Sequence, residues 1–247
     1  MPATKIVTQM MITAALGALL LSAIPSEAQQ KRPANGYALK EPTTPEEIAA
    51  AKPNPQTPGF RVPLPPLDQM DPALRADYEF NAKRLKTPVP PTAPLMLTPD
   101  IKSEVARVLG PVGKAGLPDD LTDFTIIMVA RQWGAQFEWW VHAPQAVIVG
   151  VPAETVEAIR TGRTPTKWGN PGQEATYHFL VELLRDHKVS DATYEKLRAI
   201  LGTPRLVALT SLAGYYDGLA MTLIAHNLPL RADVKPPLPP LAVSFPR

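Results

Sequence analysis

The chain has 247 residues, with 25 basic and 23 acidic side chains, 30 prolines and no cysteine. Because the charge is nearly balanced and no dense basic block occurs, the composition gives no support for nucleic acid or an anionic membrane surface as a partner. The absence of cysteine excludes disulfides and thiol chemistry, so folding must rest on a hydrophobic core alone.

The N-terminal residues 1–28 have the layout of a secretory signal peptide. Lys5 precedes an apolar run from Met10 to Ile24, and Ser26-Glu27-Ala28 places small residues three and one before a cut ahead of Gln29. This run is short for a bilayer span. We expect cleavage after Ala28, a periplasmic or secreted protein, and no stable membrane association afterwards. An uncleaved membrane anchor is the alternative.

Residues 29–94 are predicted to form a proline-rich arm, because they contain 14 prolines. Proline supplies no amide donor and disfavours helix at the residue before it, so most of the arm should be extended. One short helix is predicted over 71–85, with Asp71 as cap and Pro72 at its first position. Such an arm can present a polyproline ligand to a partner or wrap the body or a neighbouring subunit, and we favour wrapping.

Residues 95–230 are predicted to form an all-α domain, because helix start and stop signals recur and no period-two alternation is seen. The last helix is apolar nearly all round, so it should be buried or face a partner subunit. Residues 231–247 form a second proline-rich arm. The expected helices are 98–110, from behind Pro118 to Trp133, 135–149, 152–162, 173–187, 191–202 and 204–227.

The stretch "GAQFEWWVHAP", residues 134–144, contains the main chemical candidate. Glu138 and His142 are four residues apart, which places both on one face of a helix with Cβ atoms about 6 Å apart. We expect them to touch or share a water, so that the carboxylate favours the protonated ring and fixes its tautomer. Ala135 on the same stripe would leave space above that turn. An ordinary ion pair is the alternative, but the apolar surroundings would desolvate it.

The segments "LTDFTIIMVARQWGAQFEWWVHAPQAVIVGVPAETVEAIRTG", "VSDATYEKLRAILG" and "LVALTSLAGYYDGLAM" resemble the carboxymuconolactone decarboxylase-like, or AhpD-like, family. The resemblance covers about residues 60–230 and is most specific over 121–162. It implies an all-α helical bundle, here with proline-rich N- and C-terminal arms. It also implies a homo-oligomer, trimer or hexamer, with the site near a subunit contact.

The thiol-active branch of that family has an upstream glutamate, a Cys-x-x-Cys pair and a histidine four residues after the second cysteine. Carried onto this chain, these positions are Asp123, Ala135, Glu138 and His142. Because both cysteines are missing, the peroxide-reducing disulfide chemistry of that branch is excluded. The chain is more similar to the decarboxylase branch, which acts on a small lactone acid without metal, flavin or thiol.

The resemblance therefore implies a cofactor-free carboxy-lyase, or a related lyase or isomerase, acting on a small organic acid. His142 would donate the proton, Glu138 would be its orienter or partner base, and Asp123 a more distant acid. The candidate substrate-binding residues are Arg131, Ala135 and Tyr216.

These further candidates have plainer alternatives. Arg131 lies two turns before Glu138 if the helix continues through Gly134, and a salt bridge to Asp123 or Glu138 is its alternative role. Core packing is the alternative for Tyr216 and its neighbour Tyr215. Glu174 and His178 repeat the four-residue spacing, and we interpret that pair as structural.

Two other interpretations stay open at the sequence level. Asp123, Glu138 and His142 could supply three metal ligands, but single-histidine carboxylate sets are poor zinc sites, and no metal or cofactor is expected. A noncatalytic helical module that binds a small molecule or a protein is the competing class. An enclosed pocket with a reachable His142 ring would favour the enzyme, whereas a buried and fully bonded ring would favour the module.

Overall fold

The computed structural model describes residues 59–62, 67–70, 72–87, 89–96, 110–242 and 245–246. The predicted signal peptide 1–28, the arm before residue 59 and nearly all of the expected helix 98–110 lie outside the described residues. Within them the predicted all-α class is confirmed, because every element is helical and no strand occurs. The elements are η1 Leu67–Gln69, α4 Pro72–Leu85, α5 Ala93–Met96, α7 Asp119–Trp133, α8 Gln136–Ile148, α9 Ala153–Arg160, α10 Pro171–Asp186, α11 Asp191–Leu201 and α12 Thr203–Ala225.

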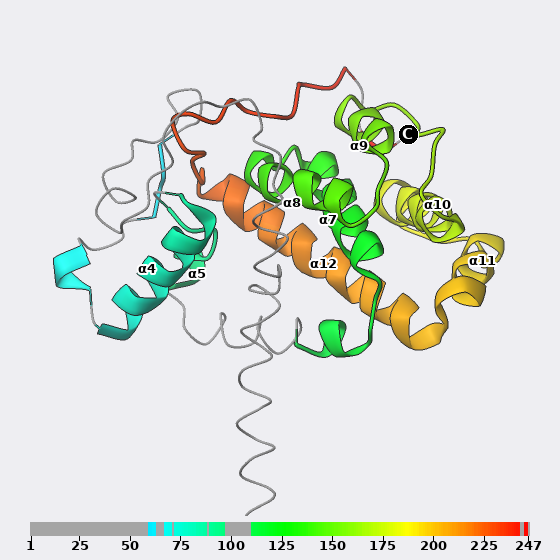
Figure 1. The fold of residues 1–247 in the computed structure, drawn as a ribbon, viewed down its shortest axis with the longest axis horizontal. Coiled ribbons are helices and arrows are strands. Elements are labelled where there is room, and N and C mark those ends of the chain that lie inside the picture. The colour runs from blue at the N-terminus through cyan, green and yellow to red at the C-terminus, as the bar shows by residue number, and fades with distance from the viewer. Residues whose placement is uncertain are drawn as a thin grey trace, which may run out of the picture.

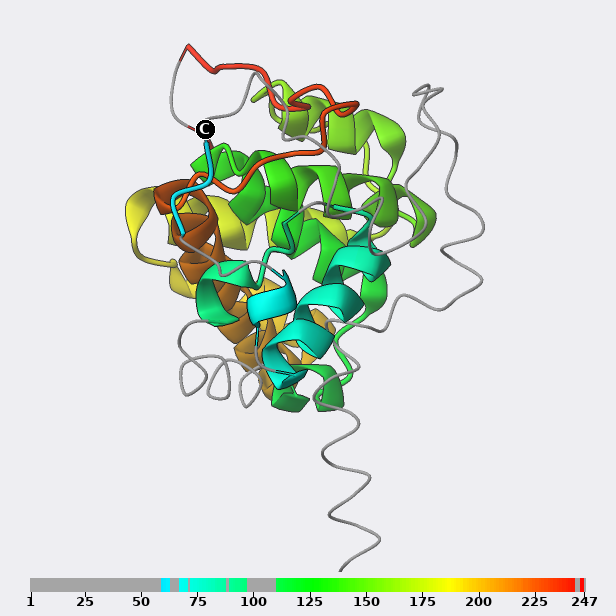
Figure 2. The same cartoon turned by 90° about the vertical axis from the view of Figure 1, so that its left-hand side faces the viewer.

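Helix α7 forms the centre of the core. It packs against α8, α10 and α12, and every residue from 124 to 130 is at most 2% exposed. A helix enclosed on several sides buries apolar groups all round, which accounts for the run "FTIIMVA" in its sequence. Figure 1 shows α12 crossing the middle of the molecule, with α10 and α11 at one end and α4 and α5 at the other. Turned by 90°, α4 lies in front of this bundle (Figure 2).

Local sequence explains the helix ends. Asn170 caps α10 by accepting a hydrogen bond from the Gln173 N–H at 3.1 Å, and Ser190 caps α11 in the same way through the Thr193 N–H at 3.3 Å. Helix α7 ends at Gly134, whose φ of 67° is the left-handed conformation that glycine adopts without strain. The Ala135 N–H then donates to the Ala130 carbonyl at 2.8 Å. This two-residue connection folds α7 and α8 into a helical hairpin.

Helix α12 is long and apolar enough to cross a membrane by length and composition, and it is the one such helix among the described residues. Within its most apolar window 44% is buried in the protein, and the core helix of a soluble protein meets the same criterion. Its inner side carries fully buried leucines such as Leu209. Its outer side leaves Val207 57% and Met221 44% exposed.

The residues after α12 run back over the helices as an extended segment, drawn red in Figure 1. We call residues 234–242 the C-terminal strap. Val234 and Leu238 of the strap are 2% and 4% exposed, so they belong to the core. The Gln136 amide donates to the Leu238 carbonyl at 3.0 Å and accepts the Leu238 N–H at 2.9 Å. This part of the 231–247 arm therefore wraps the body of its own chain.

Candidate functional site

The α7–α8 hairpin brings Asp123 and His142 face to face. His142 Nδ1 lies 2.8 Å from Asp123 Oδ1, and the two side chains are 20% and 16% exposed. An ionised carboxylate at this distance holds the hydrogen on Nδ1, which leaves Nε2 as the acceptor of the neutral ring. The expected pairing of His142 with Glu138 is wrong, because Asp123 on the other helix is the direct partner of the ring.

Helix α12 closes the other side of the imidazole with Tyr216. The Tyr216 hydroxyl lies 3.4 Å from His142 Nε2, and the two rings meet edge to face with centroids 5.3 Å apart. Tyr216 is 7% exposed. Asp123, His142 and Tyr216 thus form one chain of polar groups across three helices, which we call the Asp-His-Tyr chain.

The hydroxyl of Tyr216 is held in its protonated form. Burial is the main cause that raises the pKa of Tyr216 well above 10.0, and nearby Tyr215, Glu138 and Asp123 raise it further, whereas Arg84 lowers it. A protonated phenol can donate to Nε2 of a neutral ring or to a bound substrate. Because the distance to Nε2 is long for a hydrogen bond, the hydroxyl is not firmly committed to the ring.

Glu138 lies inside the protein and makes no hydrogen bond to any residue that the structure describes. It is 2% exposed, and both carboxyl oxygens are buried without a partner. Burial, and secondly the charge of Asp217, raise the pKa of Glu138 well above its ordinary 4.5. The negative charge of Glu138 in turn contributes to the raised pKa of Tyr215, after burial. Glu138 therefore keeps its proton to a higher pH than an exposed glutamate, and such unsatisfied buried carboxyls are characteristic of functional sites.

Two other predicted site residues lie elsewhere. Ala135 is 2% exposed at the start of α8, so the predicted open space above it is not there. Arg131 is 3% exposed, and its Nη2 donates to the Pro239 carbonyl at 2.9 Å. The condition that would have put Arg131 two turns before Glu138 on one helix is not met, since α7 ends at Trp133, as expected, and Gly134 is its C-cap. No salt bridge joins Arg131 to Asp123 or Glu138 within the described residues.

The structure adds two charged residues that sequence reasoning did not select. Asp217 on α12 accepts a 2.5 Å hydrogen bond from Trp133 Nε1 and acts on Glu138 electrostatically. Arg84 on α4 is close enough to Tyr216 to lower its pKa. The adjacency of Asp217 to the two tyrosines was a possible signal for the first. Nothing in the sequence spacing connects Arg84 to His142.

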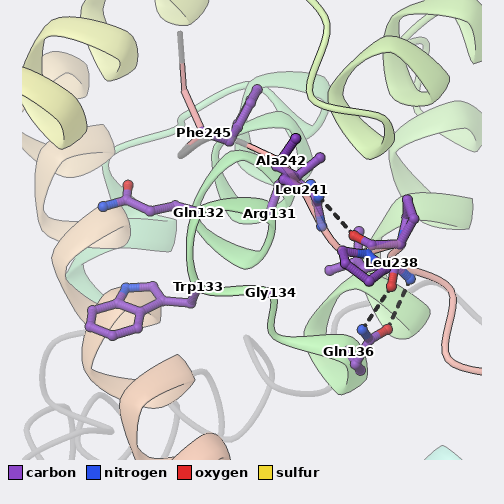
Figure 3. Close-up of a pocket in the computed structure, with 11 residues that line it drawn as sticks. Arg131, Gln132, Trp133, Gly134, Gln136, Leu238, Leu241, Ala242 and Phe245 are labelled. Atoms are coloured by element: carbon purple, nitrogen blue, oxygen red, sulfur yellow. Dashed lines mark hydrogen bonds between the residues drawn. The ribbon is translucent and has the colours of Figure 1, made fainter.

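The structure also places His178, the residues considered as metal ligands and a cavity. His178 is exposed on α10, and its ring contacts Tyr177 with centroids 5.5 Å apart. Within the described part of the chain, no group of three or more His, Asp or Glu side chains is placed to hold a metal ion. The cavity shown in Figure 3 lies at the α7–α8 turn under the strap and does not include His142.

No family model matches the chain, and neither the curated proteins nor the solved structures contain a match. The family resemblance seen in the sequence therefore stays a prediction.

Proposed function

We propose that this chain is a cofactor-free acid-base enzyme acting on a small organic acid, of the kind that the carboxymuconolactone decarboxylase-like resemblance implies. The observation that carries the proposal is the Asp-His-Tyr chain, in which a one-fifth exposed imidazole is oriented by Asp123 at 2.8 Å. An imidazole fixed in one tautomer between an acid and a protonated phenol can transfer a proton near neutral pH.

For a lactone acid the proposed step is decarboxylation. The bond between the ring carbon and the carboxylate breaks, carbon dioxide leaves, and the electron pair moves into the conjugated carbonyl of the substrate. Imidazolium His142 then gives its Nε2 proton to the carbon, and water restores that proton. Asp123 stabilises the imidazolium, and the Tyr216 hydroxyl stabilises negative charge on the substrate carbonyl.

Glu138 has a different part in this scheme from the one expected from spacing. As a buried carboxyl with a raised pKa, Glu138 keeps its proton to a higher pH than an exposed glutamate, and where it ionises its charge raises the pKa of Tyr215 and Tyr216. Ionisation of Glu138 would place an uncompensated charge beside Tyr216 and weaken its ability to stabilise a developing oxyanion. The positive charge of Arg84 lowers the pKa of Tyr216, and in this scheme it also favours an anionic substrate.

A noncatalytic helical module is the second candidate, and one observation favours it. Both nitrogens of His142 have protein neighbours, and the described cavity lies elsewhere. In that case the Asp-His-Tyr chain would hold α7, α8 and α12 together, as buried polar networks do.

We further propose that the protein is a homo-oligomer whose subunits contact each other through α12. We also propose that its N-terminal segment directs its export. The outer side of α12 is exposed at Val207, Ser211, Gly214, Gly218, Met221 and Ala225. These residues alternate in steps of four and three, carry no charge and are mostly small, a pattern that lets two helices pack closely.

Light scattering with size-exclusion chromatography tests the oligomer. Met221→Asp is expected to lower the measured mass, whereas Ile200→Asp on α11, at the same 44% exposure, should leave it unchanged. A monomeric wild-type protein, or an oligomer unaffected by Met221→Asp, contradicts this part of the proposal.

The enzymatic proposal is tested by incubating the purified protein with small unsaturated lactone acids and measuring carbon dioxide release. His142→Gln is expected to lower turnover by about 100-fold or more, the usual contribution of a positioned general acid. Asp123→Asn should lower kcat by mispositioning the ring. His178→Gln, on an exposed histidine, is the matched control and should have wild-type activity. Turnover that survives His142→Gln would remove the assignment, and no turnover of any such acid favours the module.

A further inference from the structure

Arg131 is a buried cation that forms no ion pair with any carboxylate among the described residues. It is 3% exposed, and within the described residues its one hydrogen bond is from Nη2 to the Pro239 carbonyl. Its Nε is buried and has no hydrogen-bond partner in the described part of the chain. A guanidinium has five N–H donors, so most of its capacity is unused here. Burying a charge is costly unless an opposite charge or several hydrogen bonds compensate it, so this position calls for an anion.

The charges near Arg131 strengthen the argument that an anion belongs beside it. Burial, and secondly the positive charge of Arg160, lower the pKa of Arg131, and no carboxylate of the described residues acts in the opposite direction. Arg160 itself is neutralised, because its Nε and Nη2 contact the two Glu157 oxygens at 2.7 and 2.8 Å. Among the described residues at this end of α7, Arg131 is therefore the arginine whose charge is not compensated.

A cavity of about 520 Å³, with Arg131 among its lining residues, lies between the α7–α8 turn and the C-terminal strap. In Figure 3 the side chains of Arg131, Gln132 and Gln136 come from the hairpin, and Leu238, Leu241 and Phe245 come from the C-terminal segment. One side of the cavity thus offers polar groups and a cation, and the other offers apolar side chains. The volume suits a small organic molecule.

We propose that this cavity binds a small organic carboxylate, with its carboxylate on the Arg131 guanidinium and a short apolar body against Leu241 and Phe245. A single uncompensated arginine matches a monoanion in charge and in its planar two-oxygen geometry. A phosphate would carry more charge and would need further donors that the apolar strap does not offer. The site is independent of the proposed function, because Arg131 lies eight residues from Asp123 along α7, a rise of about 12 Å.

Binding at this place would also act on the strap. The strap already uses its backbone to accept hydrogen bonds from Arg131 and from Arg160, whose Nη1 donates to the Pro237 carbonyl at 3.1 Å. A ligand held between the hairpin and the strap stabilises the folded protein in proportion to its occupancy. Thermal unfolding is therefore a readout that needs no enzymatic activity.

The experiment measures the melting temperature of the purified protein and the heat of binding with benzoate, with benzyl alcohol as the uncharged probe of similar shape and with inorganic phosphate. Benzoate is expected to raise the melting temperature with dose, and the other two probes to have no such effect. Arg131→Gln should weaken benzoate binding about tenfold or more, the usual effect of losing a charge-assisted hydrogen bond. Arg163→Gln, on an exposed arginine, is the control and should bind as the wild type does.

A second variant decides the question if Arg131→Gln does not fold. Ala242→Glu places a carboxylate at the exposed rim of the same cavity, where Ala242 is one of the lining residues. It should raise the melting temperature without ligand and abolish the response to benzoate. The proposal is overturned if the wild type does not respond to benzoate, if benzyl alcohol or phosphate acts equally well, or if either variant keeps the wild-type response.

Discussion

Replacing Glu138 with glutamine should change how the stability of the protein depends on pH. The carboxyl is buried with no hydrogen-bond partner among the described residues, and its pKa in the folded protein is well above the ordinary 4.5. Between these two pKa values the folded state keeps a proton that the unfolded state releases. The free energy of unfolding therefore falls as pH rises above 4.5 and levels off once the folded pKa is passed.

The size of this pH dependence is limited because a single carboxyl binds or releases one proton. The largest slope that a single group can produce is about 1.4 kcal/mol per pH unit. Glutamine has nearly the same shape and no charge at any pH, so this contribution disappears in Glu138→Gln. The variant should therefore gain stability relative to the wild type, by up to about 1.4 kcal/mol for each unit above pH 4.5 until the folded pKa is reached.

Urea unfolding at pH 5, 6, 7 and 8, followed by tryptophan fluorescence, measures this difference. Glu157→Gln is the control, because Glu157 is exposed and its hydrogen bonds to Arg160 lower its pKa. Its stability difference from the wild type should not grow above pH 5. A difference between Glu138→Gln and the wild type that stays constant from pH 5 to 8 would refute the view that Glu138 is held in its protonated form.

Three further variants test the scaffold by urea unfolding. Gly162→Ala should cost about 1–2 kcal/mol, because φ is 72° there and the added Cβ would lie 2.7 Å from Leu241 Cδ2; unchanged stability contradicts this. Asn170→Ala removes the cap of α10 and should cost about 1 kcal/mol, with a neutral result arguing against the cap. Gln136→Ala removes both hydrogen bonds to the Leu238 backbone, and should cost about 1–3 kcal/mol and make the strap easier to cleave by protease, which wild-type cleavage rates would disprove.

Most helices could be predicted because residues close to their ends determine where they begin and end. Pro118 precedes α7, Asn170 caps α10 and Ser190 caps α11, each acting through neighbouring backbone groups. The end of α7 was predicted at Trp133, yet the effect of Gly134 on the direction of the chain was not taken into account. Glycine can continue a helix or stop it, and tertiary packing makes that choice.

The sequence predicted which residues belong to the site better than it predicted which of them contact each other. The site forms because α7 and α8 pack as a hairpin and α12 crosses them, which brings together Asp123, His142 and Tyr216. Residue spacing along one helix cannot predict this packing of three helices. The four-residue rule places Glu138 and His142 on one face of α8, but it does not say that, among the described residues, the buried Glu138 carboxyl makes no hydrogen bond to the ring. The position of Arg131 depended on the strap, about a hundred residues further along the chain.

The short connection between α7 and α8 fixes the register of the acid and the imidazole. Only Gly134 and Ala135 separate the two helices, so nothing in the turn can absorb a change of length. One inserted residue would rotate α8 by about 100° relative to α7 and carry His142 away from Asp123. The hairpin should therefore tolerate substitutions of its side chains but not the insertion of a residue. Because α7 and α8 are neighbours in the chain, Asp123 and His142 can pair as soon as these two helices pack together.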